Sequence, residues 1–310
     1  MQNKHLLSIN DLSRSEVQSL FATAQELKSL RNKRIPHRRL EGHTLAMIFE
    51  KPSLRTRATF EIGIFQLGGQ AVYFQPHDIR LGVRETVADV AHNMERWFDL
   101  IMCRVFTNQT VRTLAENSRV PVINGLCDKE HPCQALTDLF TIQEHMETLS
   151  GRTLAFIGDG NNVAHSLMLL CAKVGMDFNL ACPPGYEPDP DIVMQAESIA
   201  AATGSHLRVS NDPVAMAKGA DVLYADVWVS MGQEDEAQDR LKIFQPYQIN
   251  QQLLNYAHPN ARVMHCLPAH RGEEITDEVI DGKQSIVFDQ AENRLHVQKA
   301  IMVTLLDACP

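Results

Sequence analysis

No segment of this sequence is apolar over the roughly 20 residues that a membrane-spanning helix requires. The opening segment, as far as Glu16, also lacks the apolar core of a signal peptide. We therefore expect a protein of the cytoplasm that has no membrane partner.

Positive charge is also scarce. The 310 residues include 29 Lys and Arg against 38 Asp and Glu, which gives a net charge of −9. Nucleic acids and anionic lipid surfaces are bound by broad basic faces, so this balance argues against either partner. Any basic anion site in this chain is expected to be local.

The cysteines do not form a recognisable set. There are seven, an odd number, and they lack the close spacing of a metal site. Reduced thiols in a cytoplasmic protein explain this better than a disulfide framework does. The sequence thus predicts neither disulfides nor a bound metal.

What is present is an alternation of strand-like and helix-like segments without internal repeats. Such alternation indicates a parallel sheet covered on both faces, and the chain is too long for one ordinary core. The predicted fold is α/β, with two doubly wound parallel-sheet domains linked by helices and divided at the polar stretch 148–152. Strands are expected at 44–50, 71–75, 100–104, 121–124, 153–157, 178–182 and 222–225, and helices at 14–33, 54–67, 109–117, 131–147 and 292–307, with others beginning near 85 and 162.

A candidate anion site lies at residues 51–57, where the first of these strands meets its helix. A helix N-terminus presents backbone N–H groups and the positive end of the helix dipole. Ser53 and Thr56 add hydroxyl groups, while Arg55 and Arg57 add planar cations that suit phosphate. The same pattern is typical of a Ser-capped helix whose arginines face water. Locally, both interpretations stand.

Two further motifs precede predicted helices. Residues 131–134, His-Pro-Cys-Gln, offer hydrogen bonds to a carbonyl oxygen, although His-Pro is also a common structural cap. Residues 158–163, Gly-Asp-Gly-Asn-Asn-Val, suggest a dinucleotide site, but Val163 replaces the third glycine and the next strand ends in two prolines. Asn161 and Asn162 would instead offer amides to another ligand, or simply form a turn.

Three single residues complete the candidates. Asp226 closes an apolar strand, where its carboxylate would hold an ammonium group or cap a helix. Cys266 follows another apolar run; a lone cysteine is more often buried than reactive, and no Cys–His–Asn set accompanies it. Arg294, near the start of the last predicted helix, is by default a solvated cation.

Taken in order, these motifs resemble a known family. From about Leu7 onward the chain contains S-L-R-T-R, F-E-x-G-x-x-x-L-G-G, H-P-C-Q, D-G-N-N, D-V-W-V-S-M-G-Q-E and H-C-L-P-A-H-R-G-E-E. The set looks like that of the ornithine carbamoyltransferases. The S-x-R-T-R and H-P-x-Q motifs mark the wider superfamily, which includes aspartate carbamoyltransferase, whereas D-x-x-x-S-M-G with H-C-L-P marks the ornithine enzymes.

The resemblance implies transfer of the carbamoyl group of carbamoyl phosphate to the side-chain amine of L-ornithine, giving L-citrulline and phosphate, with no cofactor. It implies a carbamoyl phosphate-binding domain at 1–147, rejoined by a C-terminal helix at 292–310, and an ornithine-binding domain at 148–291. The residues implied as catalytic are Arg55, Arg104, His131, Asp226, Cys266 and Arg294. Carbamoyl phosphate would be bound by Ser53, Leu54, Arg55, Thr56, Arg80, Arg104, His131, Pro132, Cys133, Gln134, Cys266, Leu267 and Arg294, and ornithine by Asn162, Asp226, Ser230 and Met231.

The resemblance also implies a homotrimer with shared active sites and a place in arginine metabolism, in synthesis or in breakdown. Two positions depart from the commoner pattern. Leu54 stands where the family often has threonine, and Arg80 where a glutamine usually reaches the neighbouring subunit's phosphate. We expect a sequential, non-covalent reaction with closure of the domains and of the loop at 230–232.

Two rival functions remain open at this stage. The acceptor could be another amine, such as putrescine or an acylated ornithine, although Asp226 with residues 230–232 favours free ornithine. The chain could also be an inactive homologue that serves as a binding subunit, although the complete set of implied catalytic residues argues against this.

Overall fold

The computed structural model describes residues 4–229 and 234–308, and the chain divides into two compact units. The first unit comprises Met1–Phe140 and Glu292–Pro310, and the second comprises Thr141–Ala291. Both divisions fall inside helices, α6 (Pro132–Met146) and α13 (Val287–Asp307). In the described part of the chain, no helix is long and apolar enough to cross a membrane.

The first unit is built on a four-stranded parallel sheet of order β2-β1-β3-β4. Its central strands are almost wholly buried, as continuous apolar runs in parallel sheets are expected to be. The strands are β1 (Thr44–Phe49), β2 (Gln70–Phe74), β3 (Leu100–Arg104) and β4 (Val122–Leu126).

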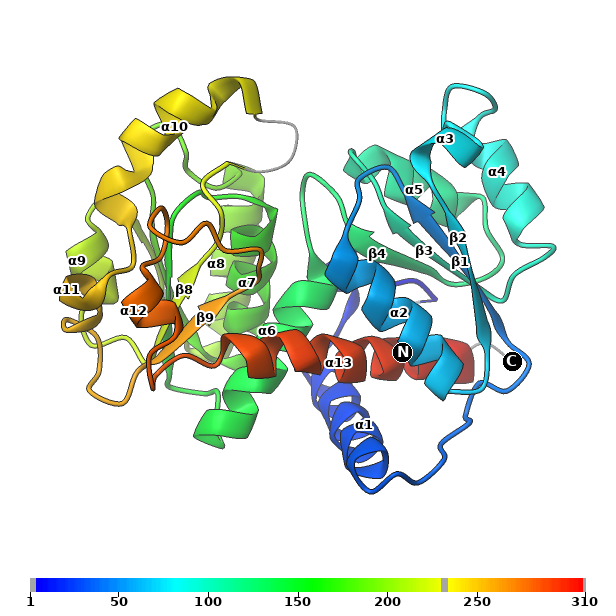
Figure 1. Cartoon of the computed structure of the whole chain (residues 1–310), viewed down its shortest axis with the longest axis horizontal. Coiled ribbons are helices and arrows are strands. Elements are labelled where there is room, and N and C mark those ends of the chain that lie inside the picture. Colours follow the sequence, from blue (N-terminus) through cyan, green and yellow to red (C-terminus); the bar gives the residue numbers. More distant parts are fainter. Residues whose placement is uncertain (1–3, 230–233, 309–310) are drawn as a thin grey trace. The chain divides into compact units, whose positions relative to one another are not determined.

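Helices cover both faces of this sheet. Helices α4 and α5 pack on one face, where Val90, Ile101 and Leu114 share a buried cluster, and α2 lies on the other face (Figure 1). Besides α6 and α13, the helices of this unit are a short 3₁₀ turn (Ile9–Asp11), α1 (Arg14–Asn32), α2 (Leu54–Gln66), α3 (Pro76–Ile79), α4 (Val87–Met94) and α5 (Asn108–Glu116).

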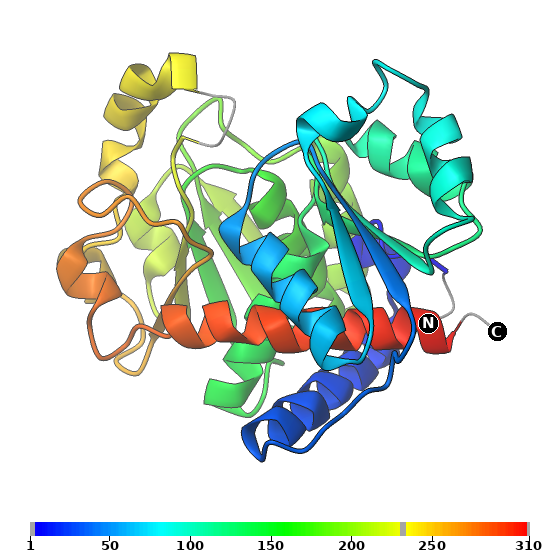
Figure 2. The same ribbon diagram turned by 45° about the vertical axis from the view of Figure 1, so that its right-hand side comes forward.

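The second unit is built on a five-stranded parallel sheet of order β7-β6-β5-β8-β9. Helices α7 and α8 lie on one face, and α9, α11 and α12 lie on the other (Figures 1 and 2). The strands are β5 (Thr153–Ile157), β6 (Asp177–Ala181), β7 (Leu207–Ser210), β8 (Val222–Ala225) and β9 (Arg262–His265). The helices are α7 (Asn162–Val174), α8 (Pro190–Thr203), α9 (Pro213–Ala217), α10 (Ala237–Phe244), α11 (Gln251–Leu254) and α12 (Asp277–Ile280), with 3₁₀ turns at Glu234–Glu236 and Gln245–Tyr247.

Each sheet has one point at which the direction of strand addition reverses. In the first sheet it lies between β1 and β3, and in the second between β5 and β8. Ligands of open α/β sheets bind outside the carboxyl ends of the strands at such points. The fold therefore predicts that a ligand would bind near the residues that follow β1, β3, β5 and β8.

The predicted α/β fold with two parallel-sheet domains is confirmed, and β3 and β5 have the predicted bounds. The short helix α3, which begins at Pro76, was not among the helices expected from the sequence. The last helix begins at Val287 rather than near Glu292, because residues 287–291 contain no helix breaker. The division within α6 lies before the polar stretch 148–152 at which the sequence suggested a boundary.

Candidate active site

The N-terminus of α2 lies at the carboxyl end of β1. Ser53 caps this helix, because its Oγ accepts a hydrogen bond from the backbone N–H of Thr56 at 3.2 Å. Leu54 is the first helical residue and is 79% exposed, whereas Arg55 beside it is half-buried. The first N–H groups of a helix lack intrahelical partners, so the helix start that the sequence predicted here is present, while its use as an anion site stays a prediction.

Arg294 of α13 joins the start of α2 to the start of α6. Its Nη2 donates to Thr56 Oγ1 at 2.8 Å, and its Nη1 donates to Gln134 Oε1. Gln134 in turn donates through Nε2 to Asp138 Oδ1 at 2.7 Å. Arg294, Thr56 and Gln134 are each at most 3% exposed. The default interpretation of Arg294 as a solvated cation is therefore wrong.

His131 immediately precedes α6 and is buried together with Arg104, the last residue of β3. Burial lowers the pKa of His131 well below its usual range, and the positive charges of Arg294 and Arg104 lower it further. The imidazole is consequently neutral at physiological pH. It can donate one hydrogen bond without adding a charge to the two guanidinium groups.

Cys133 lies in the first turn of α6, next to Pro132, the first residue of that helix. Its Sγ is fully buried and donates to the backbone oxygen of Asn124 at 3.5 Å. Burial raises the pKa of the Cys133 thiol to about 12, so the group is protonated and poorly nucleophilic. Its side chain packs against β4.

Two other arginines of the first unit, Arg57 and Arg80, have surroundings that differ from those of Arg294. The Arg57 guanidinium stacks 3.9 Å from the centre of the Tyr73 ring and pairs with Glu61 at 3.3 Å, so it is engaged away from the helix tip. Arg80 ends α3 in the left-handed region at φ 48° and is exposed. It lines a hollow of about 180 Å³ together with Glu50.

In the second unit, Asp226 follows β8 at the reversal point and is 8% exposed. Its Oδ2 accepts from Asn161 Nδ2 at 2.9 Å, and its Oδ1 accepts from Cys266 Sγ at 2.9 Å and from the N–H of Val227 at 2.8 Å. The structure thus brings together Asp226 and Cys266, which were separate candidates in the sequence. The thiol of Cys266 acts here as a donor to a carboxylate.

The turn after β5 fixes this arrangement. Asn161 Oδ1 caps α7 by accepting from the backbone N–H groups of Val163 and Ala164, while its Nδ2 holds Asp226. Asn162, the residue predicted to bind substrate, is the first residue of α7. At Gly160 a Cβ atom would lie 2.4 Å from the backbone nitrogen of Pro188, so only glycine fits.

Sequence reasoning missed the partner of Asp159. Arg240 of α10 is 3% exposed, forms an ion pair with Asp159 and donates through Nε to the Trp228 oxygen at 2.6 Å. Burial raises the pKa of Asp159, and the Arg240 charge opposes this. No motif surrounds Arg240, which lies in an ordinary polar helix.

Ser230 and Met231, which were predicted to bind ornithine, lie outside the described residues.

The segment after β9 carries a second unforeseen pair. His265 Nε2 and Glu274 Oε1 are 2.9 Å apart, and both side chains are fully buried. The N–H of Leu267 donates to His265 Nδ1 at 2.9 Å, and Leu267 itself adopts φ 59°. This pair fixes the turn that presents Cys266 and Leu267.

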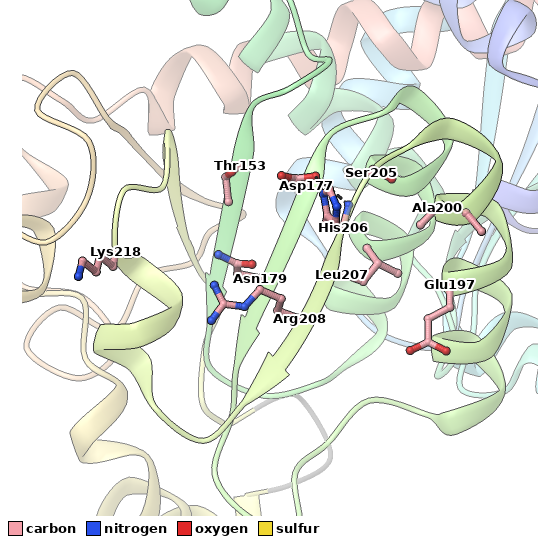
Figure 3. Close-up of a pocket in the computed structure, with 11 residues that line it drawn as sticks. Thr153, Asp177, Asn179, Glu197, Ala200, Ser205, His206, Leu207, Arg208 and Lys218 are labelled. Carbon is pink, nitrogen blue, oxygen red and sulfur yellow. Dashed lines mark hydrogen bonds and ion pairs between the residues drawn. The ribbon is translucent and has the colours of Figure 1, made fainter.

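A larger hollow of about 530 Å³ occupies the opposite end of the second sheet. Its lining includes Thr153, Asp177 and Leu207, the first residues of β5, β6 and β7 (Figure 3). Asp226 lies instead at the carboxyl end of β8. Of the residues implied to bind substrate, none that the structure describes lines this hollow.

Two family models match this chain, each over most of one of the two units. Residues 4–144 match the aspartate/ornithine carbamoyltransferase carbamoyl-P binding domain, and residues 150–305 match the Asp/Orn binding domain of the same family. An ornithine carbamoyltransferase of Methanothermobacter thermautotrophicus is 54% identical over 98% of this chain and 99% of its own, and one of Thermococcus kodakarensis is 51% identical over 99% and 97%. The solved ornithine carbamoyltransferase of Pyrococcus furiosus superposes with a TM-score of 0.96 at 50% identity, covering 98% of this chain and 97% of that one. The chain therefore belongs to the aspartate/ornithine carbamoyltransferase family, among its ornithine carbamoyltransferases.

Proposed function

We propose that this chain transfers the carbamoyl group of carbamoyl phosphate to the side-chain amine of L-ornithine, releasing L-citrulline and phosphate. The observation that carries the proposal is the buried cluster of Arg294, Thr56 and Gln134 beside neutral His131. It combines a cation, a hydroxyl and an amide at two helix starts, which suits a ligand with both phosphate and carbonyl groups.

In the first unit, the phosphate is assigned to the start of α2. The groups that hold it are the hydroxyls of Ser53 and Thr56, the backbone of Leu54 and the guanidinium of Arg55. Arg104 and Arg294 supply further buried positive charge. His131 and Gln134 bind the carbamoyl group, and Pro132 and Cys133 hold the turn that places them.

In the second unit, ornithine is assigned to Asn162, Asp226, Ser230 and Met231. Asp226 provides the carboxylate for an ammonium group of the substrate, and Asn161 with Cys266 holds that carboxylate in place. A diamine that lacks the amino-acid carboxylate, or an acylated ornithine that lacks the free α-ammonium group, would match this site less well.

The reacting species is the neutral side-chain amine, because an ammonium group has no lone pair with which to attack. Attack places negative charge on the carbamoyl oxygen, which Arg104, His131 and Thr56 would stabilise; one such donor is typically worth about 3 kcal/mol. Phosphate then leaves and can take up the amine proton. Because the Cys266 thiol donates to Asp226, we assign Cys266 and Leu267 a positioning role without covalent chemistry.

Two substitutions test the assignment of the substrates separately. Asp226→Asn is expected to abolish most citrulline formation while calorimetry still detects carbamoyl phosphate binding. Arg55→Ala is expected to weaken carbamoyl phosphate binding first. If Arg55→Ala turns over at a near-normal rate, the phosphate site is misplaced, and if Asp226→Asn keeps its ornithine affinity, the ornithine site is misplaced.

We also propose that the chain works in the cytoplasm as a homotrimer in which Arg80 reaches a neighbouring copy's phosphate. Exposed apolar side chains on α2 and β2, Leu54, Ile62, Phe65 and Val72, support self-association of the first unit. Light scattering after size exclusion should give three chains per particle, and Phe65→Asp should lower that number. A monomeric wild-type particle with full activity would overturn this proposal.

A further inference from the structure

The segment after β9 contains a buried carboxylate that has hydrogen-bond partners for only one of its two oxygens. Glu274 is fully buried, and its Oε1 accepts from His265 Nε2 at 2.9 Å and from the backbone N–H of His270 at 2.6 Å. Its other oxygen, Oε2, is buried without a hydrogen-bond partner. A buried carboxylate in this condition is unfavourable unless a cation or a further donor compensates it.

The neighbouring side chains do not supply that cation. His265 Nδ1 accepts a hydrogen bond from the N–H of Leu267 at 2.9 Å, so only Nε2 of this ring is placed to donate to Glu274. Arg271 is engaged with Asp277 and Asp281, at 2.6 Å from each. Among the described residues, no lysine or arginine pairs with Glu274.

Two further side chains that could bind a metal ion, those of His270 and Glu273, lie beside this carboxylate. One ligand atom from each of His270, Glu273 and Glu274 lies within 4.8 Å of the others. The distance from His270 Nδ1 to Glu273 Oε2 is 3.4 Å, which matches the separation of two ligands around a tetrahedral ion with bonds of about 2.1 Å. The side chains of His270 and Glu273 are 46% and 39% exposed, so they can adjust and an ion can enter.

We propose that His270, Glu273 and Glu274 bind a divalent cation of the zinc type. One imidazole with two carboxylates is a ligand set that suits zinc better than magnesium, and solvent would complete the coordination. The ion would neutralise Glu274 and hold it against His265, which fixes the turn at Leu267. The site is separate from the groups assigned to either substrate.

Zinc binding to the full chain, freed of metal with a chelator, tests this proposal by calorimetry and by thermal unfolding. The wild type should bind one Zn²⁺ per chain and unfold at a higher temperature with it. His270→Ala and Glu273→Gln should each weaken binding by about tenfold or more. The matched control is His206→Ala, because His206 also faces one carboxylate, Asp177 at 3.3 Å, and should leave zinc binding unchanged (Figure 3).

A thiol is the main alternative zinc ligand, so Cys266→Ser distinguishes the two sites. Full zinc affinity in Cys266→Ser, with loss in His270→Ala, supports the proposal. It is overturned if Cys266→Ser removes binding, if His270→Ala binds as the wild type does, or if the wild type binds no zinc. Co²⁺ provides an independent spectrum: tetrahedral bands without thiolate charge transfer are expected, and a thiolate band would contradict the site.

Discussion

At the scale of single residues, protonation decides what each group can do. His131 is buried beside the positive charges of Arg294 and Arg104 and is neutral near pH 7, so in the proposed reaction it would donate a hydrogen bond to the developing oxyanion and would not act as an acid. Cys133 is a buried thiol whose proton is retained. Among the described residues proposed to bind carbamoyl phosphate, only the arginines therefore carry a fixed positive charge.

Arg294 is predicted to matter far more than Arg57, although both are on or beside α2. Arg294→Gln loses a buried cation bonded to Thr56 and Gln134, and we expect kcat/KM for carbamoyl phosphate to fall by about a hundredfold or more. Arg57→Gln is the control, since its partners are Glu61 and Tyr73, and should change kcat/KM by less than about threefold. Equal losses in steady-state kinetics would contradict this account of the two arginines.

The Cys266 thiol is predicted to act as a hydrogen-bond donor to Asp226. Cys266→Ser keeps a donor at that position, whereas Cys266→Ala leaves Asp226 Oδ1 with one partner fewer. We expect the alanine variant to raise KM for ornithine by about tenfold, the equivalent of one such hydrogen bond. The serine variant should stay much closer to the wild type. A serine variant as impaired as the alanine variant would indicate chemistry that only sulfur supplies.

At the scale of the elements, helix starts do most of the positioning. Helices α2 and α7 begin at reversal points of their sheets, and each is capped by a residue of a site motif, Ser53 or Asn161. The capping side chain therefore couples local helix stability to the geometry of the site.

Ser53→Ala and Ser13→Ala separate these two effects. Each serine caps a helix by accepting from a backbone N–H at 3.2 Å, and each loss should lower the free energy of unfolding by about 1 kcal/mol in denaturant titrations. Only Ser53→Ala should also reduce citrulline formation. If both variants retain full activity, Ser53 acts as a structural cap alone.

The motifs and the strand pattern were enough to predict the α/β architecture, because buried parallel strands read as continuous apolar runs. They also predicted where the candidate residues lie, since His131 and Gln134 stand at the start of one helix and Asp226 follows the end of a strand. The roles of these residues stay predictions. What they could not reveal are contacts set by tertiary structure. Arg240 pairs with Asp159 from a distant part of the chain. His265 and Glu274 stand at the two ends of one motif, but the order of residues in a motif does not show which of its side chains are in contact.

At the scale of the whole molecule, buried histidines set the response to acid. Burial lowers the pKa of His5 to about 4 and of His296 to about 3, and that of His131 also lies well below its usual range. The unfolded chain takes up these protons near pH 6.5, whereas the folded chain does not. Stability is therefore fully present above pH 6.5 and is lost as the pH falls toward the folded pKa values.

Denaturant titrations at pH 7.5, 6.5 and 5.5 should show this loss. Each such histidine contributes at most about 1.4 kcal/mol per pH unit below 6.5, and partial solvent access reduces this for His5. His296→Gln, which lies outside the proposed substrate contacts, should flatten the dependence between pH 6.5 and 5.5. An unchanged slope in this variant would mean that His296 takes up its proton equally in the folded and unfolded states.

The most direct test of the proposed function is citrulline formation by the purified chain. Carbamoyl phosphate would be offered with L-ornithine, putrescine, N-acetylornithine or L-aspartate across pH 6 to 10. We predict that kcat/KM is highest for ornithine and rises with pH, because the reacting amine, with a pKa of about 10.4 in water, must be neutral. No citrulline at any pH, or faster carbamoylation of another amine, would contradict the proposed function.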